Sequence, residues 1–382
     1  MGLVLSVSAA LIIPTNLLVA AALLKLLLKR GCQSWCFVLN LALADTLVGV
    51  AITGLATEDF SNSFSHHHYA PLVSYNSTNT SQPAPPGKTR CLLRMAFLTS
   101  PCVASISSMF LISLDRYIAI KLPLHYSLMS GRGKTVGFLL ALWIGSFTTG
   151  FLPVMVHQLQ AAGPYDGFCA FFNVTHDITI IILYCALFFP LLSLFIFMYL
   201  DILKIACIHH KQISQIRQMS SRAEDSHHGP SQYHHHPQHH LLRSWSHVKA
   251  LKTVLVLVGC FLVLWSPFFV VCIVHLLCRR CALKEVLENY LWLLGLLNSL
   301  INPLVYACWQ REVRLQLSAM FSCITSRLLS EAAPGVMERG HSSPPAHNHA
   351  CVSEGDTPSP SIMIPISSLD AQAVHFTDTT SL

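Results

Sequence analysis

The sequence predicts an all-α membrane protein, a seven-transmembrane helix bundle with an amphipathic eighth helix. Of the 382 residues 53% are hydrophobic and only 11% are charged, whereas about 25% of the residues of a typical soluble domain are charged. The mean hydropathy of +0.52 leaves too little polar surface to cover a water-soluble globule. The net charge of +6 needs no nucleic-acid partner, because the basic residues cluster in short loops between apolar stretches.

Seven apolar stretches are long enough for transmembrane helices, which need about 20 residues to cross the hydrocarbon core. They are residues 3–28, 35–57, 91–120, 134–157, 176–205, 248–277 and 286–308. Each contains isolated polar residues, which indicates helices packed in a bundle. A membrane β-barrel is excluded, since its strands would be short and alternating.

Basic residues indicate which loops face the cytoplasm. They concentrate after the first, third and fifth spans, at Lys29, Arg30, Lys121, Arg132, Lys134, Lys204, Lys211, Arg217, Arg222, Arg243 and Lys249. Cytoplasmic loops carry an excess of Lys and Arg. We therefore expect a multi-pass protein of the plasma membrane with an extracellular N-terminus and a cytoplasmic C-terminus.

Four further segments complete the predicted organisation of the chain. Within the bundle of residues 1–308, segments 58–88 and 206–245 are rich in His, Ser and Pro, and such sequences bury too little apolar area to fold. Histidine tracts can bind metal, but no second ligand type accompanies these at a fixed spacing, so flexible solvated loops are favoured. Residues 309–329 follow as the amphipathic helix, and residues 330–382 as a disordered cytoplasmic tail.

Glycosylation sequons begin at Asn76, Asn79 and Asn173. The first two lie in the first predicted outer loop, and the third lies before the fifth span. All three are on the side that the charge pattern assigns to the outside, so we expect N-linked glycans there.

An acid and a base stand side by side at the inner end of the third span, in Asp115-Arg116-Tyr117. Ionisable residues at such a position are costly and usually functional. Together with marks in the other spans, this motif resembles the rhodopsin-like G-protein-coupled receptors over residues 1–325. Those marks are Asn16, Asn40–Asp45, Trp143, Pro190, Trp265-Ser266-Pro267 and Asn302–Tyr306.

The resemblance implies a receptor that couples to a heterotrimeric G protein and to arrestin, and not an enzyme. Four segments, Asn40–Gly54, Arg94–Phe97, Phe188–Pro190 and Tyr290–Tyr306, are similar to family members that respond to oleoylethanolamide and lysophospholipids. Those members couple to the stimulatory G protein and raise cAMP. A lipid ligand is therefore expected.

The resemblance also implies a disulfide between Cys91, at the start of the third span, and Cys169 in the following outer loop. The extracellular side is oxidising, which favours this bridge. Cys278 and Cys281 could form a second bridge. Zinc is disfavoured there, because only two cysteines are present.

Asp45 is a carboxylate in the middle of an apolar span, where a lipid-facing charge would cost several kcal/mol. The resemblance implies that Asp45 is surrounded by four polar residues, Ser105, Asn298, Ser299 and Asn302. Oxygen ligands suit a small hard cation. We expect a sodium ion or a water network that rearranges on activation, and no other cofactor.

The resemblance implies a packing switch formed by Ile106, Pro190 and Phe261, with Trp265 one helical turn from Phe261. Each of these residues alone would more often be ordinary core. Pro267 and Pro303 remove backbone hydrogen bonds within their helices and favour kinks there. Pro303 belongs to the Asn302–Tyr306 motif of the last span, which the resemblance also assigns to the switch.

Arg116 is expected to pair with Asp115 at rest. Many relatives have an acid in the sixth span that also holds this arginine, but His247 stands there. Without that second acid Arg116 is held less strongly, and the free-energy difference between the resting and active states becomes smaller. This predicts high basal signalling. Met198 replaces an activating tyrosine of many relatives, and Tyr199, one position away, is not expected to substitute.

The cytoplasmic side carries three further predicted sites. Leu124 matches the residue that inserts into the G protein, although it could be an ordinary interfacial leucine. Cys323, in a segment suited to the inner leaflet, is either palmitoylated or buried. Thr380-Ser381-Leu382 resembles a C-terminal PDZ ligand.

The predicted ligand pocket combines two charged residues with apolar ones. By the resemblance, Leu98 stands where amine receptors have an aspartate, so a cationic amine would lack a counter-ion there. Arg94 and Glu288 would bind a polar head, unless they form only a surface ion pair. The pocket residues are Arg94, Phe97, Leu98, Phe171, Phe172, Trp265, Glu288 and Trp292. Such a set suits a small head on a long apolar tail.

Three alternatives to a lipid-amide receptor would each require other features in the sequence. A secondary transporter would show inverted repeats and broken helices in two halves, and seven spans without internal similarity argue against it. A membrane enzyme would need a buried cluster of His, Asp or Glu, and only Asp45 is deeply placed. Within the receptors, another lipid class, lysophospholipid or endocannabinoid, is the alternative.

Overall fold

A computed structural model describes the chain at residues 2–31, 33–68, 86–122, 125–126, 131–163, 165, 167, 169–224, 238–278, 281 and 283–332. Seven helical segments among these residues are long and apolar enough to cross a membrane. The predicted fold class is therefore confirmed. Residues Met1–Ile324 form one compact unit, and Thr325–Leu382 form another.

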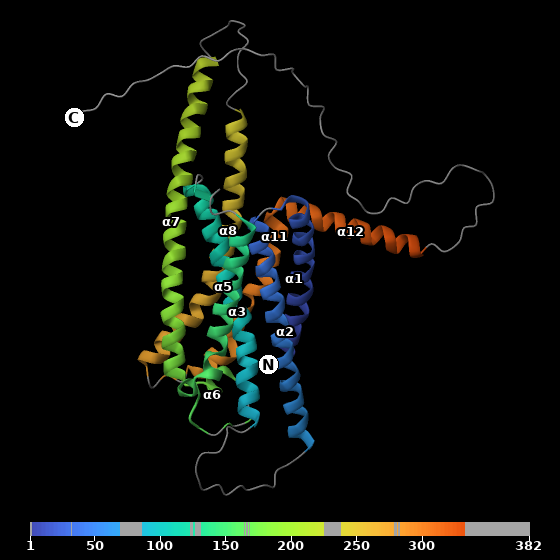
Figure 1. Cartoon of the computed structure of the whole chain (residues 1–382), viewed down its shortest axis with the longest axis vertical. Coiled ribbons are helices and arrows are strands. Elements are labelled where there is room, and N and C mark those ends of the chain that lie inside the picture. Colours follow the sequence, from blue (N-terminus) through green and yellow to red (C-terminus); the bar gives the residue numbers. More distant parts are fainter. Residues whose placement is uncertain are drawn as a thin grey trace, which may run out of the picture. The chain divides into compact units, whose positions relative to one another are not determined.

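The first six spans are single helices (Figure 1). They are α1 (Gly2–Arg30), α2 (Gln33–His68), α3 (Pro86–Lys121), α5 (Arg132–Met155), α7 (Asp177–Glu224) and α8 (Gln238–Leu277). Between α5 and α7 lie the short helices η1 (His157–Leu159) and α6 (Phe171–Val174).

The seventh span is assembled from four consecutive pieces. They are α9 (Lys284–Val286), the π-helical turn η2 (Leu287–Leu291), α10 (Trp292–Leu296) and α11 (Asn298–Trp309). The backbone is extended at Gln310, and α12 (Arg311–Ala332) follows. In α12 the apolar Val313 and Leu317 are buried against the bundle core, whereas Arg311 and Arg314 are exposed. This distribution supports the predicted amphipathic eighth helix.

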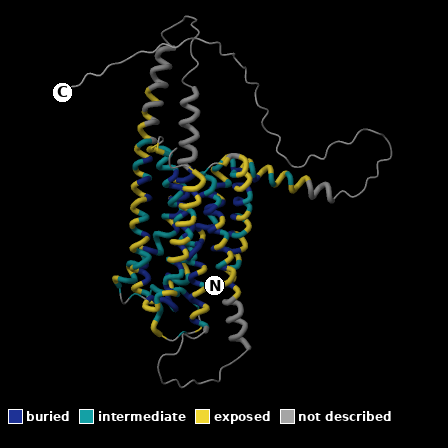
Figure 2. The backbone as a smooth tube through the Cα atoms, viewed as in Figure 1, coloured by how far each residue is buried: buried dark blue, intermediate teal, exposed yellow. Residues whose placement is uncertain are grey.

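The first helices pack against their neighbours in sequence order, and the last span packs against the first. α1 packs along α2, α2 along α3 and α3 along α5, while α11 contacts both α1 and α8. Exposed residues follow the outward faces of the bundle helices (Figure 2). Large apolar side chains are among them, including Ile144 at 67% and Val263 at 72% exposure. Apolar outward faces are what a lipid environment requires.

The structure corrects the extent of the two predicted flexible loops. α2 continues to His68, α7 continues to Glu224 and α8 already begins at Gln238, so parts of segments 58–88 and 206–245 are helical. A helix that is already nucleated gains one hydrogen bond for each added residue. Extension beyond the bundle therefore does not require the apolar burial on which the prediction was based.

Candidate ligand cavity and signalling network

A cavity of about 190 Å³ lies between the helices near the Cys91–Cys169 disulfide. We call this part of the bundle the disulfide end, and the opposite part, around Arg116, the arginine end. Residues from α1, α2, α3, α6, α7, α8 and the seventh span border the cavity. Six of the predicted pocket residues are among them: Leu98, Phe171, Phe172, Trp265, Glu288 and Trp292.

The cavity wall is almost entirely apolar. Leucine, isoleucine and aromatic side chains make up most of it, together with the thiols of Cys102, Cys185 and Cys272. Glu288 is the one charged side chain among the described residues that border it. Leu98 is buried and apolar, so the cavity has no carboxylate at that position for a cationic amine.

Two predicted pocket residues do not border the cavity. Phe97 is 57% exposed, and its ring packs on the ring of Phe151 of α5, with centroids 5.1 Å apart. Successive helical residues are turned by about 100°, so Phe97 faces away when Leu98 faces inward. Arg94 does not border the cavity either and interacts with other residues of the protein. Neither side chain therefore lies on this cavity, and a role of either in ligand binding stays a prediction.

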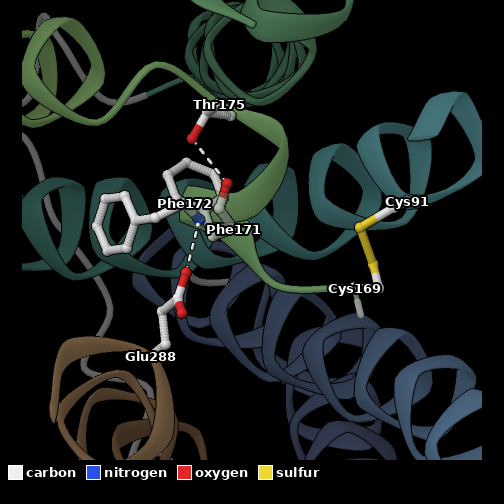
Figure 3. The surroundings of a disulfide bond; sticks show 6 residues. All are labelled: Cys91, Cys169, Phe171, Phe172, Thr175 and Glu288. Atoms are coloured by element: carbon white, nitrogen blue, oxygen red, sulfur yellow. Dashed lines mark hydrogen bonds between the residues drawn. A yellow bond between two sulfur atoms is a disulfide. The ribbon is translucent and has the colours of Figure 1, made fainter. Parts of the chain in front are cut away.

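One wall of the cavity at the disulfide end is the loop that contains α6. The Cys91–Cys169 bridge joins this loop to α3. The N–H of Phe172 donates a hydrogen bond of 3.1 Å to Oε1 of Glu288 (Figure 3). An antiparallel bridge between Gln160 and Thr175 holds the far end of the loop. The second predicted bridge, Cys278–Cys281, is also formed.

Trp265 lies on the opposite side of the cavity, packed against Gly295 of α10. A Cβ atom at Gly295 would lie 2.9 Å from the indole ring, so only glycine permits this approach. Phe261 is fully buried, with its ring centroid 6.0 Å from that of Phe188 and 5.8 Å from that of Phe195. Ile106 borders the cavity. The predicted switch residues Ile106, Phe261 and Trp265 therefore lie between the cavity and the arginine end.

Asp45 is fully buried and accepts three hydrogen bonds. Ser105 Oγ donates to Oδ1 at 2.7 Å and Ser299 Oγ at 2.8 Å, while Asn302 Nδ2 donates to Oδ2 at 2.8 Å. Asn298, predicted for the same set, instead directs its Nδ2 toward the Met109 sulfur, 4.0 Å away. One carboxylate thus joins α2, α3 and α11.

The Asp45 surroundings fit a small cation. The amide oxygens of Asn298 and Asn302 are buried and have no hydrogen-bond donor among the described residues. The hydroxyl oxygens of Ser105 and Ser299 have lone pairs that could turn toward a cation. A carboxylate with hydroxyl and amide oxygens is a donor set for a hard ion such as sodium.

Two other polar residues of the predicted motifs also link helices. Asn16 Nδ2 donates to the Ser299 carbonyl at 2.9 Å, which ties α1 to α11. Asn40 Nδ2 donates to Ser108 Oγ at 2.8 Å and Asn40 Oδ1 accepts from Trp143 Nε1 at 2.9 Å. Asn40 therefore connects α2 with α3 and α5.

At the arginine end Asp115 is buried and holds Arg116. Arg116 Nη2 lies 2.6 Å from Asp115 Oδ2, to which Ser34 Oγ also donates at 2.8 Å. Tyr126 donates from its hydroxyl to Asp115 Oδ1 at 3.0 Å. Burial, and then the negative charge of Asp115, raise the pKa of Tyr126, which keeps this donor protonated. Sequence reasoning found the Asp115–Arg116 pair but missed Ser34 and Tyr126.

A second polar cluster at the arginine end was not predicted. Tyr117 donates from its hydroxyl to Asp201 Oδ2 at 2.9 Å, and Lys121 forms an ion pair with the same oxygen. These contacts join α3 to α7. The sequence does contain a sign of this cluster, because Asp201 is a lone acid at the inner end of a long apolar span. Its partners could not be read from spacing.

Several predicted sites have limited structural context. His247 is a residue of α8 and not an acid. Tyr199 and Tyr306 both have buried hydroxyls without a hydrogen-bond partner among the described residues, and Met198 is buried in the same core cluster.

Among the predicted modification and partner sites, Asn173 lies in α6. Cys323 is disulfide-bonded, and a palmitoyl group would need the same sulfur. Leu124, Asn76, Asn79 and Thr380–Leu382 lie outside the described residues.

Comparisons with known proteins agree with this architecture. Residues 15–306 match the family of 7 transmembrane receptors of the rhodopsin type. The chain is 44% identical over 321 residues to the human glucose-dependent insulinotropic receptor, covering 84% of this chain and 85% of that protein. The rat receptor of the same name is 43% identical over 84% of this chain and 61% of its own length. The human histamine H2 receptor is 25% identical over 75% of this chain and 70% of its own length.

Proposed function

The chain belongs to the rhodopsin family of seven-transmembrane receptors, and from this membership we propose that it is a lipid-amide receptor. A receptor of this family has a ligand and a heterotrimeric G protein as partners and is not an enzyme. The proposed ligand has a long acyl chain and a small uncharged head, as oleoylethanolamide has. Binding activates the stimulatory G protein and raises cAMP. A role in insulin release, as the name of the human relative suggests, belongs to the same proposal.

The apolar cavity is the observation that carries this proposal. Its border consists mainly of aliphatic and aromatic side chains, and each methylene of an acyl chain buried there contributes about 0.8 kcal/mol. The one charged side chain on the described border, Glu288, would repel a carboxylate or phosphate. A head that donates hydrogen bonds, such as an amide or a hydroxyl, would instead find an acceptor.

A cAMP assay in transfected cells tests the ligand class. Fatty-acid ethanolamides of increasing chain length should raise cAMP, and lysophospholipids of equal chain length should be weaker. Each methylene removed should reduce potency about fourfold, the equivalent of about 0.8 kcal/mol. A stronger response to lysophospholipids or to other endocannabinoid lipids, with none to oleoylethanolamide, would favour the alternative ligand class.

The arginine end supports the proposal of high basal signalling. Arg116 pairs with Asp115, while α8 has His247 where an acid would add a second restraint. We propose that Leu124, Asn302, Pro303 and Tyr306 act with Arg116 in G-protein coupling, and that sodium at Asp45 stabilises the resting state. Receptor-transfected cells without ligand should contain more cAMP than vector controls. Added sodium should lower that level.

The proposed topology puts the N-terminus outside the plasma membrane. The positive loops of the arginine end, the sequons at Asn76, Asn79 and Asn173 and the disulfides of the opposite end support it. Glycosidase treatment should increase the electrophoretic mobility of the surface-expressed protein, and substitution of the three asparagines should abolish the shift. Binding of arrestin, and of a PDZ protein at Leu382, stays a prediction. Palmitoylation of Cys323 also stays a prediction, and it would require reduction of the disulfide at that sulfur.

A further inference from the structure

The four-residue helix α6 depends on its surroundings for its position. An isolated helix of this length is unstable, because nucleation is unfavourable and few hydrogen bonds follow. Yet Phe171 and Phe172 of α6 both border the cavity. Whatever holds α6 in place therefore determines the shape of this wall.

Both main-chain groups of Phe172 are held by side chains from the start of the seventh span. Glu288 Oε1 accepts the N–H at 3.1 Å (Figure 3), and Lys284 Nζ donates to the carbonyl oxygen at 3.0 Å. Lys284 Nζ also lies 3.9 Å from Asp177 Oδ2, at the first residue of α7. Lys284 thus connects three parts of the disulfide end: α9, α6 and α7.

The other restraints on this loop act farther from Phe172. The disulfide holds Cys169, before α6, and the Gln160–Thr175 bridge holds the residue after it. Two end restraints still permit the segment between them to rotate. Thr175 donates to the Phe171 carbonyl and the N–H of Asn173 to the Ala170 carbonyl, but these contacts lie within the loop and move with it. Lys284 and Glu288 instead bind the Phe172 main chain from another helix, and so restrain the orientation of the Phe172 ring relative to the bundle.

We propose that Lys284 is a positioning residue that holds α6 over the cavity and thereby sets the length of acyl chain that the receptor accepts. Lys284 does not border the cavity itself, so it acts through the Phe172 carbonyl. Without this donor α6 tilts away, the cavity opens to water, and discrimination between chain lengths decreases. The chain-length part of this inference rests on the proposed function, whereas the closure of the cavity does not.

The free thiols of the cavity provide a ligand-independent test of closure. Cys102, Cys185 and Cys272 border the cavity and are unpaired. A membrane-impermeant methanethiosulfonate should label them slowly in intact cells. In Lys284→Met, which keeps an unbranched side chain one atom shorter but removes the donor, labelling should be about tenfold faster, the change expected for loss of one hydrogen bond to a charged donor. A C102S/C185S/C272S receptor provides the background.

Matched variants separate the hydrogen bond from the charge. Lys284→Arg keeps a cationic donor and should label at the wild-type rate. Arg90→Met removes a cation from an exposed position of α3 and should also leave the rate unchanged. If Lys284→Met does not reach the cell surface, Lys284→Gln, whose donor is shorter, should show intermediate labelling.

The second readout is the ratio of potencies for a long and a short fatty-acid ethanolamide. Lys284→Met should bring this ratio closer to one, and Lys284→Arg should retain the wild-type ratio. Wild-type labelling rates in Lys284→Met and Lys284→Gln would overturn the inference. A wild-type receptor that responds to no ethanolamide would refute the proposed function and leave the labelling test of closure in force.

Discussion

The two ends of the bundle are held together by different kinds of interaction. At the arginine end and in the middle of the bundle, buried polar groups join the helices: Asp45 accepts three hydrogen bonds and Asp115 binds Arg116, Ser34 and Tyr126. At the disulfide end the helices surround an apolar cavity, and Lys284 and Glu288 hold its loop wall by hydrogen bonds to the main chain of Phe172.

This difference assigns different physical tasks to the two ends. Apolar contacts are non-directional and scale with buried area, which suits a cavity that binds a flexible acyl chain. Hydrogen bonds to buried carboxylates are directional and costly to break, which suits a network with discrete resting and active arrangements. Under the proposed function, the cavity therefore supplies the affinity for the ligand, and the polar network is the part that rearranges on activation.

The largest effect is expected from Asp45→Ala, which tests the importance of the polar network. Ser105, Ser299 and Asn302 would lose their common acceptor, and each unsatisfied buried donor costs about 1–3 kcal/mol. Thermal unfolding of the purified receptor in detergent should shift to clearly lower temperature. Ser105→Ala, which removes only one donor, should shift it less. Equal shifts for the two variants would contradict the shared-acceptor role of Asp45.

A smaller effect on binding is expected from Leu98→Trp, which fills part of the cavity. The larger ring would displace several methylenes of an acyl chain, each contributing about 0.8 kcal/mol, so the potency of oleoylethanolamide should decrease at least about tenfold. Leu93→Trp is the matched control, because Leu93 of the same helix is partly exposed on the bundle surface. Unchanged potency in Leu98→Trp at normal surface expression would place the acyl chain elsewhere.

A still smaller effect is expected from His247→Glu, which adds an acid to α8 at the arginine end. An ion pair of the partly exposed Arg116 with this glutamate would stabilise the resting state by up to about 1 kcal/mol. Basal cAMP should therefore decrease by up to about fivefold. His247→Gln controls for the loss of the imidazole. Should both variants signal like the wild type, the missing acid would not explain high basal activity.

No effect on ligand potency is expected from Phe97→Ala. The ring lies on the outer surface against Phe151, whereas Phe172 borders the cavity. Phe172→Ala is thus the informative comparison and should reduce potency. A similar loss in both variants, measured as cAMP dose–response curves, would show that the assignment of inner and outer aromatic residues is incorrect.

Much of the cavity and of the Asp45 network could be anticipated from motif positions. Six of eight pocket residues border the cavity, and Ser105, Ser299 and Asn302 do contact Asp45. Phe97 was misplaced because one position along a helix changes its face by about 100°. Tyr126, Asp201 and Lys284 were missed because their roles depend on partners far away in the sequence.

Hydropathy and charge by themselves determined the number of spans and the membrane character of the chain, since crossing a bilayer demands about 20 apolar residues with internally satisfied backbone groups. Motifs placed along those spans determined the family. Only the tertiary structure decided which side chains meet. The contacts of Asp115 with Tyr126, of Tyr117 with Asp201 and of Phe172 with Lys284 arise when separate helices pack, and neither periodicity nor spacing encodes that packing.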